Sequence, residues 1–458
     1  MKLLRSLDEE SRVPWATIYL VIAILWGLVL VVVTPPFQAF DENAHYSRAW
    51  SVAQGEIDPG EDGQVTLPAN VAALPATFNY VDVFRGGRKY DPSLVRQIIW
   101  QPISSETVEQ PTSASGYGPL GYVPQVAGIE IVRVLGRSPL LGLYVGRVLN
   151  LLAAVIVTWF AIRLLPFAKP VIVLVALFPT TIFLSASLSP DALMLSSCLL
   201  FLCLVLRCAL KPKLDWRQMA ALGAATVVLL NVKPGYLALC LLLLLLRPSQ
   251  VGGRLRYAAY LAGCGAAAFA LNSLLLRIGP NGENAVDFSA RMGVGVRSVD
   301  ASAQLHFIVQ HPWAFTKVVH WTLAEQGLGY VGGMFGSLGW GNVGVPQLAL
   351  VLTWLGIAVC MSAVKPLPLG GLRRITLGVV APLVCLTVVL ALYLAATAVA
   401  YPRVVGLQGR YFTPALAPLL LSVVGLPLAS QSRTTKLVLV SASAIAVAAL
   451  AVVFAFYY

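Results

Sequence analysis

Residues 14–34, PWATIYLVIAILWGLVLVVVT, form an apolar run without a charged side chain. A helix needs about 20 residues to cross a hydrocarbon core of about 30 Å, so this run is long enough to span a bilayer. Hydrophobic residues make up 58% of the chain, charged residues make up 11%, and the mean hydropathy is +0.79. A soluble domain could not keep so much apolar surface out of water, so the sequence predicts a membrane protein.

Further apolar runs follow along the chain, and several of them are short or interrupted by proline. We expect an all-α polytopic membrane protein with about 11 transmembrane helices, in a range of about 10–13, that form a single integral membrane domain over residues 1–458. The predicted spans are residues 14–34, 139–162, 170–187, 190–207, 218–232, 235–247, 257–277, 346–364, 375–399, 413–430 and 437–457.

The basic residues alternate along the chain as the positive-inside rule requires. If the N-terminus is cytoplasmic, every cytoplasmic connection is basic, whereas the short outer connections hold only Lys233, Arg403 and Arg410. The formal net charge of +12 then reflects topology and does not predict a nucleic-acid partner. The residues 34–37, TPPF, lack the small side chains of a cleavage site, so we expect the first span to be retained as an anchor.

Two long segments, residues 35–138 and 278–345, interrupt the spans and fall on the predicted non-cytoplasmic side. They contain all four histidines, so groups suited to proton transfer are concentrated there. We expect interfacial helices at Asn43–Ala53 and Tyr117–Leu135, with loop and some short strands in residues 56–115.

Asp41, Glu42 and His45 follow the first span in residues 35–45, PPFQAFDENAH. A helix that starts at Asp41 would place Asp41 and His45 on one face, together with Arg48. Such a group could form a general base with an orienting partner, or part of a divalent-cation site. Asp41 could also be only a helix cap, although a cap does not need two adjacent carboxylates and a histidine.

Three further polar positions lie at the predicted outer ends of spans. Asp191 follows Ser189-Pro190, which is also the pattern of an ordinary helix start. Lys233 lies at the depth of lipid phosphates, where a lysine can also simply extend to the headgroups. Arg410, followed by Tyr411, could bind a phosphate or anchor the chain at the interface. Because Asp41, Asp191, Lys233 and Arg410 share this depth, we expect them to converge around one cavity.

Residues 332–341, GGMFGSLGWG, lack the Gly-Lys-Ser/Thr ending of a nucleotide-binding loop. They could form a flexible aromatic loop over a substrate or a glycine-rich re-entrant turn. His306, His311 and His320 lack the spacing of a zinc enzyme, so we interpret them as structural.

The order of these motifs resembles the bacterial membrane family known as domain of unknown function 2142, over roughly residues 30–425. That family is similar to the GT-C glycosyltransferases. The motifs are Asp41-Glu42-Asn43-Ala44-His45, Tyr117-Gly118-Pro119-Leu120, Ser189-Pro190-Asp191-Ala192, Lys233-Pro234-Gly235-Tyr236, Gly336-Ser337-Leu338-Gly339-Trp340 and Gly409-Arg410-Tyr411-Phe412.

The resemblance implies a GT-C-like fold and a hexosyl- or pentosyltransferase of the bacterial plasma membrane. Such an enzyme moves a sugar from a polyprenyl-phosphate donor to a glycan, lipid or protein of the cell envelope, at the periplasmic or extracellular face. Inverting chemistry would use Asp41, or Glu42 beside it, as the base. Phosphate or substrate binding would fall to Arg410, Tyr411, Lys233, Asp191, His45, Tyr117 and Trp340. No cofactor is certain, and a divalent cation could bind at Asp41 and His45.

Two other classes of protein are alternatives. A transporter would also be polytopic, but its ionisable residues should lie near the bilayer midplane. The predicted spans are nearly free of charge, with Arg147 and Arg277 near outer ends, which argues against transport. A non-catalytic polysaccharide-assembly protein stays an alternative, because no sequence feature demonstrates turnover.

Overall fold

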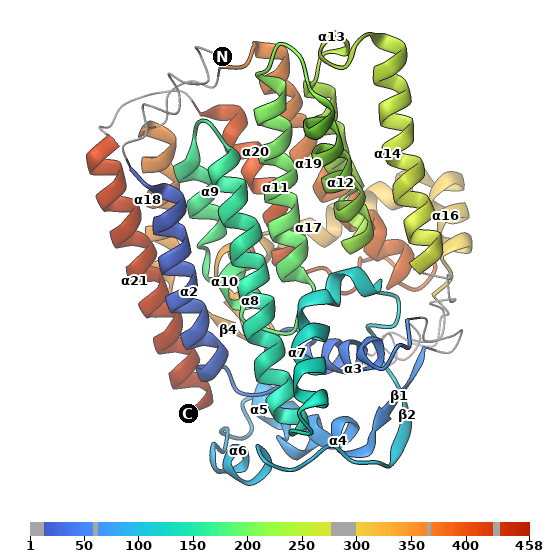
Figure 1. The fold of residues 1–458 in the computed structure, drawn as a ribbon, viewed down its shortest axis with the longest axis vertical. Helices are drawn as coiled ribbons and strands as arrows, with labels where there is room; N and C mark the ends of the chain where they lie inside the picture. The colour runs from blue at the N-terminus through green and yellow to red at the C-terminus, as the bar shows by residue number, and fades with distance from the viewer. Residues whose placement is uncertain (1–12, 58–62, 276–298, 364–367, 425–430) are drawn as a thin grey trace.

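The computed structural model describes residues 13–57, 63–275, 299–363, 368–424 and 431–458 and is predominantly helical (Figure 1). Each predicted span coincides with helical structure in its described residues, and one of them is divided in two; residues 276–277, 364 and 425–430 of the predicted spans lie outside the described residues. These helices are α2 (Trp15–Val33), α8 (Pro139–Leu164), α9 (Lys169–Ala176), α10 (Pro179–Ser185), α11 (Asp191–Ala209), α12 (Trp216–Val232), η2 (Pro234–Leu245), α14 (Arg254–Leu275), α18 (Gln347–Ala363), α19 (Gly371–Ala395), α20 (Thr413–Val423) and α21 (Gln431–Tyr457). A short helix, α13 (Pro248–Val251), precedes α14.

Among the described residues, 4 helices are long and apolar enough to cross a membrane: α2, α8, α11 and α19. The protein is therefore a membrane protein with several candidate spans, and the expected total of about 11 stays a prediction. The run at residues 170–187 breaks at Pro179, which starts α10. The run at 235–247 forms η2, a 3₁₀ helix of 12 residues, which rises about 2.0 Å per residue and so covers more depth than an α-helix of that length.

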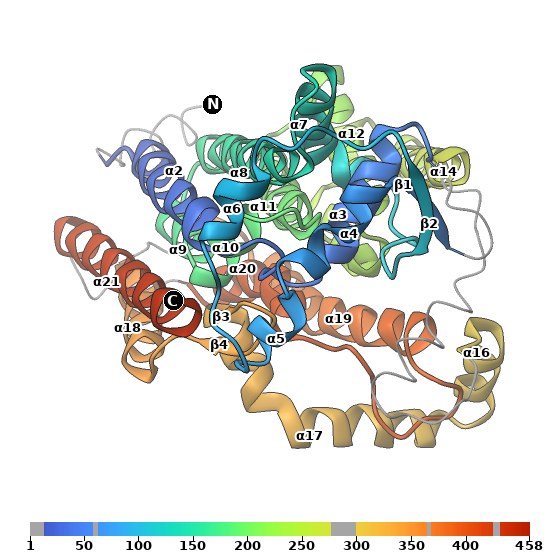
Figure 2. The same cartoon turned by 90° about the horizontal axis from the view of Figure 1, so that it is seen from below.

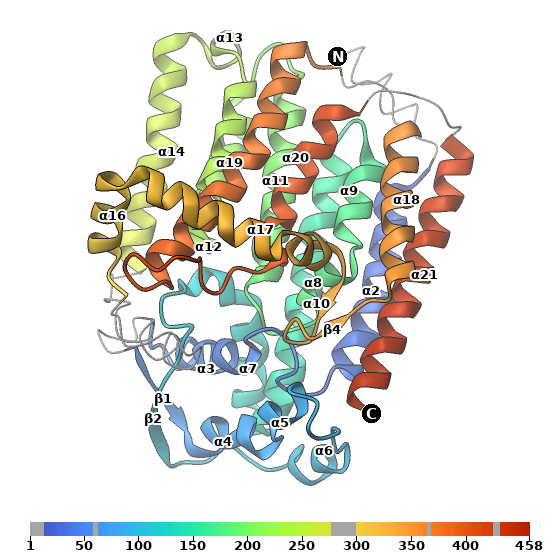
Figure 3. The ribbon, with the colours of Figure 1, turned by 180° about the vertical axis from the view of Figure 1, so that it is seen from behind.

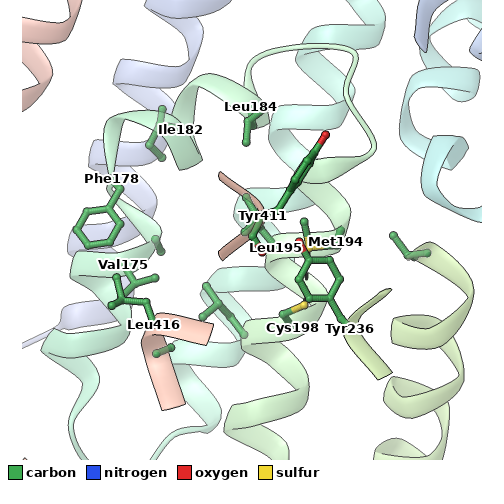
Figure 4. Packing of buried hydrophobic residues seen from close by; sticks show 14 of the residues in the cluster. Val175, Phe178, Ile182, Leu184, Met194, Leu195, Cys198, Tyr236, Tyr411 and Leu416 are labelled. Atoms are coloured by element: carbon green, nitrogen blue, oxygen red, sulfur yellow. Dashed lines mark hydrogen bonds between the residues drawn. The ribbon is translucent and has the colours of Figure 1, made fainter. Parts of the chain in front are cut away.

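The bundle is packed around α8 and α11, and its outer helices expose apolar side chains. Leu25 and Val32 of α2 are 61% and 69% exposed, as expected where lipid is the solvent. Inside the bundle, Tyr236 and Tyr411 lie beside Met194 and Leu195 of α11 (Figure 4). This packing brings residues far apart in the sequence to one end of α11.

The 35–138 segment covers one end of the bundle (Figure 2). Its elements are α3 (Glu42–Ala53), β1 (Gln64–Pro68), α4 (Ala69–Thr77), α5 (Tyr80–Phe84), α6 (Ser93–Ile98), β2 (Thr107–Pro111), η1 (Pro119–Tyr122) and α7 (Val123–Val134). The strands pair antiparallel, with Thr66 opposite Glu109. Helices occur at both positions expected in this segment, and α7 packs along α8. At their crossing a Cβ on Gly128 would lie 2.7 Å from backbone atoms of Gly146, so only glycine permits this approach.

The described part of the second long segment contains α16 (Ala301–Gln310), α17 (Pro312–Gly336), β3 (Ser337–Leu338) and β4 (Val343–Gly344). Helix α17 lies across the long axis of the bundle (Figure 3). The glycine-rich residues 332–341 were expected to form a flexible loop or a re-entrant turn. The first of them instead continue α17, and the rest form the β3–β4 hairpin, with Gly339 and Gly341 at positive φ.

Candidate functional site

Asp41, Asp191, Lys233 and Arg410 form one chain of ion pairs, which we call the charged cluster. Lys233 Nζ lies 2.7 Å from Asp191 Oδ1, and Arg410 Nε lies 3.1 Å from Asp191 Oδ2. Arg410 Nη2 then lies 2.9 Å from Asp41 Oδ2. The four side chains meet as predicted, and the cavity that we expected around them stays a prediction. An apolar pocket among the described residues, lined by Trp26, Ile182 and Ala449, includes none of them.

Local sequence places each member of the charged cluster at the end of a helix. Asp41 directly precedes α3, and Asp191 is the first residue of α11, where the helix dipole favours a carboxylate. Lys233 precedes Pro234, which restricts it to extended backbone and so ends α12. Arg410 lies in η3 (Gly409–Phe412), a 3₁₀ turn before α20.

Contacts outside the ionisable groups hold these turns together. Asn150 Nδ2 of α8 donates to the carbonyls of Ser187 and Ser189, at 2.7 and 3.0 Å, and thereby supports the turn before Asp191. The Tyr236 hydroxyl, just after Lys233, donates to the Tyr411 carbonyl at 2.9 Å. The Lys233 and Arg410 turns are therefore fixed to each other by a buried hydrogen bond.

Gly409 allows η3 to pack directly on α17. A Cβ at this position would lie 2.2 Å from the Tyr330 carbonyl oxygen and 2.7 Å from Gly333 Cα. Those are backbone atoms of a helix and cannot move aside cheaply. The glycine in the Gly409-Arg410 motif therefore serves the placement of Arg410.

The charged cluster is formally neutral, and its members differ in exposure. The side chains of Arg410 and Asp191 are 2% and 3% exposed, that of Lys233 is 19% exposed, and that of Asp41 is 37% exposed. Arg410 Nη1 is buried and has no hydrogen-bond partner among the described residues. Asp41 is thus the member most open to solvent, beside a guanidinium with an unused donor.

Aromatic rings replace much of the water around the two cations. The Arg410 guanidinium carbon lies 4.0 Å from the centre of the Phe40 ring. Lys233 Nζ lies 4.5 Å from the Tyr411 ring centre and 5.5 Å from that of Tyr117. Such contacts stabilise a cation without neutralising it, so both groups can still attract an anion.

His45 contacts the aromatic wall of the site through its ring. Its Nδ1 lies 2.7 Å from the Tyr122 hydroxyl, and its ring meets that of Tyr117 edge to face at 5.4 Å. Burial lowers the pKa of His45 to about 4, against the opposing effect of Asp41 and Asp191. His45 is therefore neutral at physiological pH. In the described parts of the chain, no three His, Cys, Asp or Glu side chains are grouped to hold a metal ion.

Glu42 and Trp340 lie in contacts apart from the charged cluster. Glu42 is fully buried and pairs with Arg147, with Arg147 Nη2 2.5 Å from its Oε2. Trp340 stacks on Phe84 at 5.2 Å and donates from Nε1 to the Phe37 carbonyl at 2.9 Å. Both expected site residues therefore connect parts of the chain, and neither presents its functional group to the cluster.

Arg147 was noted in the sequence only as a charge near the outer end of a span. Its role could have been suspected, because an arginine within an apolar helix needs a buried partner. The sequence gives no sign of which carboxylate that is.

A family model described as "Predicted membrane protein (DUF2142)" matches residues 24–420. The chain belongs to this family. The match includes every residue of the charged cluster, as well as Glu42 and Arg147. Comparisons with curated proteins and with solved structures give no match. The DUF2142 resemblance predicted from the motifs is confirmed, and the further likeness to GT-C glycosyltransferases stays a prediction.

Proposed function

We propose that the protein is a membrane glycosyltransferase that takes a sugar from a polyprenyl-phosphate donor and transfers it to a hydroxyl of a cell-envelope acceptor. One observation carries the proposal. A buried arginine with an unused donor, Arg410 Nη1, lies next to the partly exposed carboxylate of Asp41. Glycosyl transfer from a phosphate requires this combination of a cation and a base.

Arg410 and Lys233 would bind the donor phosphate. A guanidinium can donate two parallel hydrogen bonds to phosphate oxygens, and Lys233 adds a second positive charge 2.7 Å from the shared Asp191. As the bond between sugar and phosphate breaks, negative charge increases on the phosphate, and these cations stabilise it. Tyr117 and Tyr411 would limit the water that competes for them.

Asp41 would act as the general base. The acceptor oxygen attacks the anomeric carbon, its proton passes to the Asp41 carboxylate, and the polyprenyl phosphate leaves with the electrons of the broken bond. A single displacement of this kind inverts the configuration at the anomeric carbon. The Asp41 carboxylate pairs with Arg410. An incoming phosphate competes for that guanidinium and would release the carboxylate to accept the proton.

The proposed site faces the non-cytoplasmic side of a bacterial plasma membrane. The basic connections of the sequence support this orientation. Helix α2 begins at one end of the bundle and α21 ends at the other, beside the 35–138 segment (Figure 1). That arrangement is compatible with a cytoplasmic N-terminus and an external C-terminus.

The test begins with the purified protein in proteoliposomes, supplied with undecaprenyl-phosphate monosaccharides of different hexoses and pentoses. Release of undecaprenyl phosphate, dependent on Asp41, is the expected result. In parallel, lipid-linked sugars of a deletion strain are compared with those of the parent, since the unused donor should accumulate. Loss of an envelope glycan in an Asp41→Asn strain with normal protein levels would support an enzyme. An unchanged envelope and unchanged lipid-linked sugars would reject the proposal.

A further inference from the structure

We infer that Glu42 and Arg147 are positioning residues that hold Asp41 and Asp191 at the spacing that Arg410 bridges. The inference rests on the proposed function for its catalytic meaning, and on the geometry of the 37–42 turn for its structural part. It assigns Glu42, which the sequence offered as a rival base, a different role.

All the donor groups of Arg147 are engaged at the end of α2. Its Nε and Nη2 donate to Glu42, at 2.7 and 2.5 Å, and Nη2 also donates to the Pro35 carbonyl at 3.0 Å. Its Nη1 donates to the carbonyls of Val31 and Thr34, at 3.1 and 2.8 Å. The side chain is completely buried, so water cannot replace these bonds.

Glu42 connects the two turns that carry the carboxylates of the charged cluster. Its Oε2 accepts from the Phe37 amide at 3.0 Å, which closes the turn leading to Asp41. Its Oε1 accepts from the Leu188 amide at 3.1 Å, in the turn leading to Asp191. With four acceptor contacts and no exposed surface, Glu42 cannot reach an acceptor hydroxyl in this arrangement.

The 37–42 turn needs such support because its backbone is strained. Phe37 and Asp41 have φ values of 64° and 53°, in the left-handed region that residues other than glycine rarely adopt. Residues held this way persist only where surrounding contacts fix them, and they are frequent at functional sites. Asp41 pairs with Arg410 from within this turn, so loosening the turn should misplace the base.

The experiment compares Glu42→Gln and Arg147→Lys with a matched control. Glu130→Gln removes a carboxylate from the partly exposed Glu130–Arg133 pair in the same segment. We expect Glu42→Gln to lower kcat about 10- to 100-fold, with the affinity for farnesyl phosphate changed less than about 2-fold. In an Asp41→Asn background the same change should have almost no further effect, because the base it positions is gone.

A purely structural role predicts other results. Losses that multiply in the Glu42→Gln, Asp41→Asn double variant would overturn the inference, as would normal kcat accompanied only by a lower Tm. If single variants do not fold, Glu42→Gln is combined with Arg147→Met, which leaves no unpaired buried charge. That double variant should fold and still lose kcat.

A second measurement does not depend on transfer. Cysteine is introduced by Asp41→Cys, and its labelling by a membrane-impermeant maleimide is followed in nanodiscs. We expect Glu42→Gln to change the labelling rate about threefold or more, while Glu130→Gln leaves it unchanged. Equal rates would refute the positioning role even if the wild-type protein transfers sugar. A changed rate, together with a wild-type protein that shows no transferase activity, would instead refute the proposed function alone.

Discussion

Replacing Asp41 by asparagine should slow transfer strongly and, at the same time, tighten phosphate binding. The change keeps the shape of the side chain but removes the proton acceptor, so the chemical step should slow by a factor of about 10² to 10⁴. It also removes the carboxylate that lies 2.9 Å from Arg410 Nη2. The formal charge of the cluster then rises from zero to +1, in favour of an incoming phosphate.

The size of the gain in affinity follows from the exposure of the pair. A hydrogen bond to a charged group contributes about 1.5–3 kcal/mol, but the Asp41 side chain is 37% exposed and solvent screens its interaction. We therefore expect that an incoming phosphate must overcome about 1 kcal/mol of interaction between Asp41 and Arg410. Since 1.4 kcal/mol corresponds to about tenfold, farnesyl phosphate should bind about fivefold more tightly to the variant.

Calorimetric titration of farnesyl phosphate into the purified proteins measures this directly. Asp82→Asn, an exposed carboxylate of α5 outside the cluster, is the matched control and should leave both affinity and transfer unchanged. Weaker binding of farnesyl phosphate to Asp41→Asn would refute the idea that Asp41 and the phosphate compete for Arg410, and would indicate that Asp41 helps to hold the phosphate. Full transfer by the variant would end the proposal that Asp41 is the base.

Other predictions test separate parts of the reasoning. Arg410→Ala should weaken farnesyl phosphate binding about 10- to 100-fold, with only partial rescue by lysine, which lacks the two-pronged donor; an unchanged affinity would leave Arg410 as an interfacial anchor. Cysteines introduced at Ser113 and at Ser298, which lies outside the described residues, should be labelled from outside intact cells. Protection of both would show that the predicted orientation in the membrane is wrong. His45 has a folded pKa of about 4, below its usual value of 6.5, so the unfolded state binds more protons between these values. The Tm should therefore fall as pH decreases from 6.5 towards 4, and less so in His45→Gln. Gly409→Ala brings a Cβ to 2.2 Å from a carbonyl oxygen of α17, so it should lower both Tm and phosphate affinity; normal values for both would show that the close packing is not needed.

The sequence by itself determined the class of protein and most helix positions. Apolar runs such as residues 14–34 are local features, because a segment needs only its own composition to prefer lipid over water. The end of the first span before Pro35 and the break at Lys233-Pro234 were predictable too, because proline disfavours helical backbone at the residue before it. Shared depth at the ends of spans then predicted that Asp41, Asp191, Lys233 and Arg410 would meet.

Only the tertiary structure decided what each polar residue does. Glu42 and Asp41 are neighbours with the same functional group, yet Glu42 pairs with Arg147 at a separation of 105 residues and Asp41 with Arg410 at a separation of 369. Which partner a carboxylate meets depends on how α2, α8 and η3 pack, and no local pattern contains that information. The left-handed turn at Asp41 and the stacking of Trp340 on Phe84 likewise depend on contacts between distant segments. The local apolar sequence determined where the helices form, while the packing of those helices determined which buried charged side chains form ion pairs.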